Sequence, residues 1–118
     1  MNDSVKNNFK SAGFDVEGTI RRFAGNEALY EKYIFKFTED KIFESLTTAV
    51  KAGNHEDAFK ESHTLKGVSG NLGLESLAEA SSVMCAELRD GKTPPLEPLY
   101  KAVEKAYNEA ITVLNANK

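Results

Sequence analysis

The chain has 118 residues, and its composition, with 41% hydrophobic and 28% charged residues, is that of an ordinary globular protein with one buried core. Its formal net charge is −3 with both signs interspersed, which excludes the basic surface expected of a nucleic-acid-binding protein. No apolar run approaches the roughly 18 residues that a membrane span needs, and the polar start, Met1 to Lys10, is not a signal peptide. We therefore expect one cytoplasmic domain over residues 1–118, without membrane or nucleic-acid contact.

The N-terminal part is predicted to contain short helices separated by capping residues. Residues 1–12 are a polar lead, either frayed or a short helix. Asp15 is expected to cap one helix, and Asn26 the next, because their side chains can accept hydrogen bonds from free amides of the first turn. The apolar positions then move to another helical face. This shift predicts a break near Thr38, with Thr38 itself as the new N-cap.

The rest of the chain is predicted to form further amphipathic helices joined by short loops. Gly53, Gly73 and Gly91 are expected to end three of them, and Pro98 fits the first position of the last helix. No segment alternates like a strand, and no hairpin turn is present. The fold class is therefore expected to be all-α, an antiparallel up-and-down helix bundle.

His63 is expected on the outer side of the helix over residues 54–73. The inner side of this helix is a stripe of small and aliphatic residues: Ala58, Ser62, Leu65, Ser69 and Leu72. At 100° per residue, His63 lies about 140° from the centre of that stripe, so it faces water or a partner. Phe59, Lys66 and Gly70 fall within about 60° of His63 on the same flank. The imidazole is thus surrounded by an aromatic side chain, a cation and a position without a side chain.

Two glycines make this flank unusual. Each costs about 1 kcal/mol relative to alanine inside a helix, so Gly67 and Gly70 weaken the segment that carries His63. Their missing side chains allow another backbone to come close. A neutral imidazole is a good nucleophile near pH 7, and Lys66 could offset negative charge transferred to the ring. Phe59 fits a hydrophobic docking rim and simple packing at the bundle edge equally well.

The segment HTLKGVSGNLG resembles the signature of histidine-containing phosphotransfer (HPt) domains, with the His-x-x-Lys-Gly core at His63, Lys66 and Gly67. The similarity extends over roughly Asp15 to Leu114. It implies a four-helix bundle with one or two short accessory N-terminal helices. It also implies that His63 is phosphorylated, that Lys66 assists the phosphoryl group, and that the glycines admit a receiver domain.

The function implied by this resemblance is that of a phosphorelay intermediate in two-component signalling. His63 would accept a phosphoryl group from a receiver-domain aspartate or a kinase and pass it to another receiver aspartate. The partners would be response-regulator receiver domains and a hybrid or sensor histidine kinase. The receiver would carry the Mg²⁺, so no cofactor is expected on this chain. Without a P-loop or a nucleotide lid, the sequence predicts no ATP site and no autokinase activity.

Alternative functions explain fewer of these features. A non-catalytic helical adaptor accounts for the amphipathic stripes but not for two glycines beside an outward histidine. A KH-type GxxG loop at Gly67–Gly70 would need an α/β fold and a basic groove. Metal binding is disfavoured because His55 lies too far from His63 along the helix. Cys85 is expected to be a small buried hydrophobe.

The expected oligomeric state is a monomer, because one bundle uses all the apolar stripes and no long heptad seam remains. The initial methionine and the short polar ends of the chain favour a free-standing protein.

Overall fold

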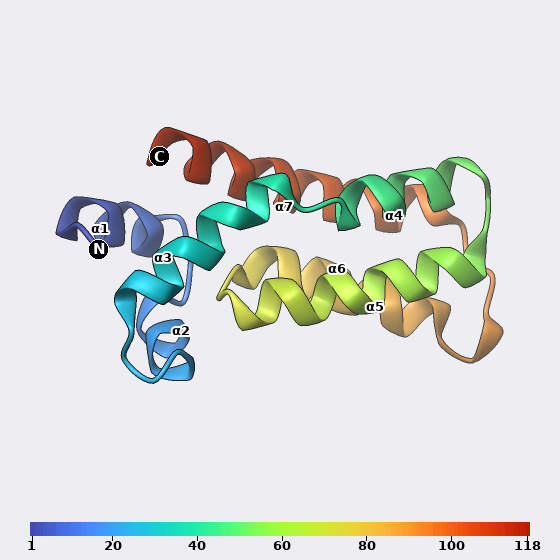
Figure 1. Ribbon diagram of the computed structural model, residues 1–118. Coiled ribbons are helices and arrows are strands. Elements are labelled where there is room, and N and C mark those ends of the chain that lie inside the picture. The colour runs from blue at the N-terminus through green and yellow to red at the C-terminus, as the bar shows by residue number, and fades with distance from the viewer.

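The computed structural model describes residues 1–118, and all of its regular structure is helical. The elements in chain order are α1 (Asp3–Ser11), α2 (Val16–Arg22), α3 (Glu27–Lys36), the 3₁₀ helix η1 (Phe37–Glu39), α4 (Ile42–Lys51), α5 (His55–Asn71), α6 (Glu75–Leu88), the 3₁₀ helix η2 (Arg89–Gly91) and α7 (Leu96–Ala116). The molecule is elongated, 44 × 25 × 21 Å, and both termini lie at one end (Figure 1). No helix has both the length and the apolar character that crossing a membrane requires.

The bundle is built around the hairpin of α5 and α6. Helix α5 packs along α6 and α4, and α7 closes the bundle against α6 and α4. Helices α3 and α4 follow one another through η1, while α1 and α2 sit at the end where the termini meet (Figure 1). The expected all-α fold, a helical bundle with short accessory helices at the N-terminus, is confirmed.

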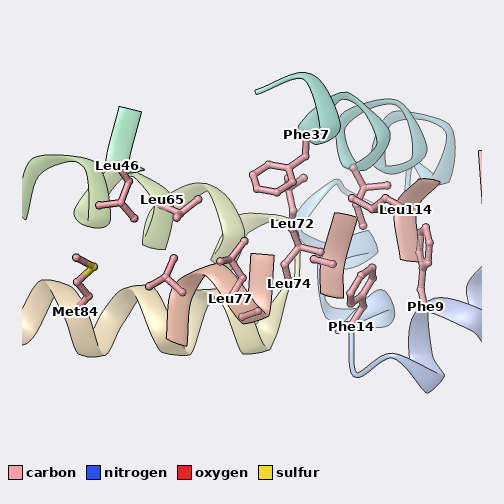
Figure 2. Close-up of a cluster of buried hydrophobic side chains, with 14 of the residues drawn as sticks. Phe9, Phe14, Phe37, Leu46, Leu65, Leu72, Leu74, Leu77, Met84 and Leu114 are labelled. Carbon is pink, nitrogen blue, oxygen red and sulfur yellow. The ribbon is translucent and has the colours of Figure 1, made fainter. Parts of the chain in front are cut away.

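The core is continuous from one end of the bundle to the other. Leu46 and Leu65 point toward Leu77 and Met84 across the bundle (Figure 2), and all four side chains are almost fully buried. Burial of each such side chain contributes roughly 1.5–3 kcal/mol relative to leaving it in water. The inner stripe of α5 is therefore fixed against the core, and the opposite face of α5 is left at the surface.

The polar lead is a packed helix. The Asn2 side chain caps α1 by accepting a hydrogen bond from the Ser4 amide at 2.6 Å. Phe9 is fully buried and lies against Phe14, with ring centroids 5.1 Å apart. Of the two possibilities that the sequence left for residues 1–12, the structure has the short helix, because Phe9 anchors it.

Most of the expected helix caps are present, but the one at Thr38 is wrong. Asp15 and Asn26 cap α2 and α3 as expected. The break after α3 is η1, and within it Thr38 Oγ1 donates backward to the Phe35 carbonyl at 2.9 Å. Asp40 accepts the hydrogen bond from the Ile42 amide at 2.8 Å instead. The Asp40 carboxylate, two residues after Thr38, therefore caps the first turn of α4.

The expected start of the last helix is also wrong by two residues. Helix α7 begins at Leu96, so Pro98 is its third residue rather than its first. Proline is tolerated there because the amides of a first helical turn have no partner within the helix. The preceding loop is held to α5 by a 2.8 Å hydrogen bond between His55 Nε2 and the Pro94 carbonyl.

Candidate functional site

The middle of α5 has a buried inner face and an exposed outer face. Ala58, Leu65 and the other members of the expected inner stripe are buried. His63 is exposed, Lys66 is half-buried, and both follow the helical spacing that the sequence predicted. The imidazole is therefore available to a partner, with the cation one turn further along the same helix.

The His63 ring is held from two sides. Its Nδ1 lies 3.7 Å from Cys85 Sγ on α6, a long sulfur hydrogen bond. Phe59, one turn earlier on α5, stacks on the ring with centroids 6.2 Å apart and an interplanar angle of 23°. The Nε2 atom makes no hydrogen bond within the protein, so its lone pair is the one that another molecule can reach.

Gly67 and Gly70 border open space. A Cβ atom built on either residue would meet no other heavy atom within 4 Å, so the internal packing of the bundle requires neither glycine. Gly73 differs, since its φ is +72° and a Cβ there would collide with Thr19 Oγ1 and the Asp15 carbonyl. The fold therefore explains Gly73, whereas no contact within the bundle accounts for the two glycines beside His63.

Phe59 lies at the edge of the bundle and also borders a hollow in the surface. It is half-buried and packs against the core at the edge of the bundle. It also lines a shallow hollow between α5 and the loop that follows α6, together with His55, Glu56, Leu88, Asp90, Gly91, Lys92 and Thr93. The side chain thus packs beside the His63 ring and leaves part of its surface exposed in the hollow.

The C-terminal end of α5 is completed by a residue from α2. Arg22 Nη2 donates to the Gly70 carbonyl at 2.9 Å and lies 3.4 Å from the Asn71 carbonyl. The last turn of α5 contains no basic residue of its own. Arg22 therefore supplies the positive charge that the negative end of the helix dipole favours. The Gly70 carbonyl is covered, while its Cα still faces open space.

Replacing Arg22 by alanine is expected to lower the free energy of unfolding by about 1 kcal/mol, because the last carbonyls of α5 lose their donor. Urea denaturation of the purified variant measures this change. Arg21→Ala is the matched control, since Arg21 is exposed, neighbours Arg22 and makes no ion pair or side-chain hydrogen bond. Equal stabilities of the two variants would contradict the capping role.

The second histidine lies apart from His63, at the start of α5. His55 hydrogen-bonds to the Pro94 carbonyl and is not part of the His63 surroundings. No group of three or more His, Cys, Asp or Glu side chains is arranged to hold a metal ion.

Two residues at this site were not recognised from the sequence. Cys85 is buried, as expected, but its contact with His63 depends on the register of α5 against α6. The short turn between α5 and α6 could have indicated this contact. In two antiparallel helices joined by a short turn, residues at similar distances from the turn lie opposite each other. Arg22 comes from a separate helix, and no spacing within α5 indicates it.

Fold and site together define a class of helical bundle that presents one nucleophilic histidine, bordered by glycines, on the outer face of a central helix. The comparison with protein-family models matches residues 34–113 to the Hpt domain. The chain belongs to this family, as the resemblance of its His63 segment suggested. Hpt domains are histidine phosphotransfer modules of two-component phosphorelays and carry no kinase site of their own. No match was found among curated proteins or among solved structures.

The family match begins at Ile34, whereas the resemblance in sequence extends from about Asp15. It therefore covers the end of α3 and the bundle helices, including the whole of α5. Helices α1 and α2 lie outside it and are the accessory helices of this chain.

Proposed function

We propose that this protein is a phosphorelay intermediate whose phosphorylated residue is His63. It takes a phosphoryl group from the aspartyl phosphate of a receiver domain, or from a kinase, and passes it to another receiver aspartate. The observation that carries the proposal is the exposed imidazole with its unbonded Nε2, next to two glycines that border open space. A plain helical adaptor gives no reason for this combination.

The transfer requires little chemistry from this chain beyond an oriented nucleophile. The Nε2 lone pair attacks the phosphorus atom, the bond between phosphorus and the aspartyl oxygen breaks, and the carboxylate leaves with the electron pair. The reverse steps, on a second receiver, release the imidazole. Lys66 shares the neutralisation of the phosphoryl oxygens with the Mg²⁺ site expected on the receiver. No cofactor bound to this chain is needed for this step.

Receiver docking is assigned to the flank that carries Phe59, Gly67 and Gly70. Phe59 offers apolar surface at the edge of the hollow beside α5, and the glycines let the partner's backbone approach the helix. The partner's aspartyl phosphate would then meet His63 from outside, in line with Nε2.

Incubation with ³²P-labelled receiver domains tests the proposal directly. Label is expected on this chain as an acid-labile, base-stable phosphoramidate after exposure to at least one cognate receiver from a broad panel. The label should then move to a second, unphosphorylated receiver. A chain that accepts no label from any receiver in the panel, while binding some of them, would support the adaptor function instead.

Lys66→Ala is expected to slow phosphoryl transfer about three- to tenfold, because one positive charge near the phosphoryl oxygens is lost. The unfolding free energy should change by less than about 0.5 kcal/mol, since Lys66 forms no ion pair. Rapid-quench measurement of the transfer rate checks the first effect and urea denaturation the second. Lys66→Arg keeps the charge and should remain closer to wild type. Identical transfer rates for the alanine variant and the wild type would remove Lys66 from the mechanism.

We also propose that the protein is a cytoplasmic monomer. Only Tyr33 and Val83 among the large hydrophobic side chains are exposed, so little apolar surface remains for a stable dimer. The single cysteine is free and buried, which suits a reducing compartment.

A further inference from the structure

We infer that Cys85 is a positioning residue for the transfer: its sulfur accepts a hydrogen bond from Nδ1–H and holds the His63 ring so that Nε2 is the atom that accepts the phosphoryl group. The inference rests on the proposed function of His63 and adds a specific role on another helix. It starts from the 3.7 Å contact between Cys85 Sγ and His63 Nδ1.

The geometry leaves one ring nitrogen for chemistry. Cys85 is fully buried on α6, and its sulfur lies 3.7 Å from Nδ1, while the Phe59 ring is stacked beside the imidazole with centroids 6.2 Å apart. An exposed histidine without these contacts would rotate freely and offer either nitrogen. Here Cys85 occupies the side of the ring that carries Nδ1, and Nε2 makes no hydrogen bond within the protein, although the residue as a whole is exposed.

The proton must be on the nitrogen that does not react. Nε2 can attack only with a free lone pair, so the neutral ring must carry its proton on Nδ1. The Nδ1–H group then donates to Cys85 Sγ, a weak acceptor. When the bond between Nε2 and phosphorus forms, the ring gains the positive charge that the lone pair gives up, and Nδ1 keeps its proton. If that proton later leaves to solvent, the thiol S–H can donate to Nδ1 in turn, because a thiol serves as donor and acceptor.

A Cys85 that only fills space and a Cys85 that orients the His63 ring predict different effects of substitution. If Cys85 only fills space, valine should replace it without effect on His63, because it is apolar and of similar size. If the thiol orients the ring, valine should disturb the tautomer, whereas serine should keep it, because a hydroxyl can also accept from Nδ1–H. Ser81 offers a control one turn away on α6, since it is buried and its hydroxyl has no hydrogen-bond partner.

The test compares wild type, Cys85→Val, Cys85→Ser and Ser81→Ala. Long-range ¹H–¹⁵N correlation spectra report the His63 tautomer, and phosphoramidate serves as a small donor that needs no receiver. Wild type, Cys85→Ser and Ser81→Ala are expected to show the Nδ1–H tautomer and phosphorylation at Nε2 only. Cys85→Val should shift toward the Nε2–H tautomer, react about fivefold more slowly, and yield some product at Nδ1. Far-UV circular dichroism verifies that each variant is folded.

Three results would overturn the inference. The first is a wild-type protein with the Nε2–H tautomer, and the second is wild-type phosphorylation at Nδ1. The third is a Cys85→Val protein with the wild-type tautomer, rate and phosphorylated nitrogen. Failure of every receiver to label the wild-type chain would instead contradict the proposed function, because the tautomer spectra and the phosphoramidate reaction do not involve a receiver. Should Cys85→Val fail to fold, Cys85→Ala provides the same loss of the thiol with less steric demand.

Discussion

Replacing His63 by glutamine is expected to abolish phosphoryl acceptance, a loss of at least about 10³-fold in the rate of label transfer from a phosphorylated receiver. The amide nitrogen of glutamine has no nucleophilic lone pair, and no other histidine lies on the outer flank of α5. Because the His63 side chain is exposed, its replacement should change the unfolding free energy by less than about 1 kcal/mol. Acid-labile, base-stable label on the purified chain is the measurement.

The matched control for this experiment is His55→Gln. His55 is the only other histidine, lies on the same helix and is half-buried through its bond to the Pro94 carbonyl. This variant should accept label at the wild-type rate, with at most a small loss of stability where the loop is held. If the His63→Gln protein still took up label and the His55→Gln protein did not, the assignment of the reactive histidine would be wrong.

The exposed face of α5 that carries His63 could be predicted from sequence because it depends on one helix alone. The repeat of 3.6 residues per turn fixes which residues share a side, and the inner stripe through Ala58 and Leu65 left His63 outside whatever the partners of α5 were. The same reasoning placed Lys66 one turn away. A clear apolar stripe in the sequence of a helix thus predicts which face of that helix is exposed.

The features that sequence reasoning missed depend on contacts between elements. Thr38 is a good N-cap by type, yet its hydroxyl bonds backward into the turn of η1, and Asp40 serves α4. The contact of Cys85 with His63 requires the register of two antiparallel helices, and Arg22 reaches α5 from an accessory helix. Local propensity decides whether a residue can cap a helix or fill a core, but tertiary packing decides which residue does so.

These contacts also explain how α5 remains helical with two interior glycines. Its inner stripe is held by the core, the Asn54 side chain caps its start, and Arg22 bonds the carbonyls at its end. Packing and capping therefore offset the roughly 1 kcal/mol that each glycine costs relative to alanine. The fold therefore stabilises a locally weak segment of α5 beside His63.

Replacing Gly67 by glutamine is expected to improve the helix and impair the function at the same time. Glutamine has a higher helix propensity than glycine, and a Cβ at this position meets no neighbouring atom within 4 Å, so the unfolding free energy should rise by roughly 0.5–1 kcal/mol. Transfer from a phosphorylated receiver should fall at least about tenfold, because the new side chain occupies the space through which the partner's backbone approaches. Urea denaturation and rapid-quench transfer assays measure the two effects.

A size series and a second donor separate loss of docking from loss of reactivity. Gly67→Ala adds a single methyl group, so it should share the gain in stability but lose less transfer activity than Gly67→Gln. Phosphoramidate needs no docking surface, and its reaction with His63 should stay within about twofold of wild type in both variants, since neither substitution alters the contacts of the ring with Cys85 and Phe59. Wild-type receiver kinetics in Gly67→Gln would show that the glycine does not serve access. If the rate of His63 phosphorylation fell equally with both donors, the substitution would have impaired the imidazole itself rather than the approach of the receiver.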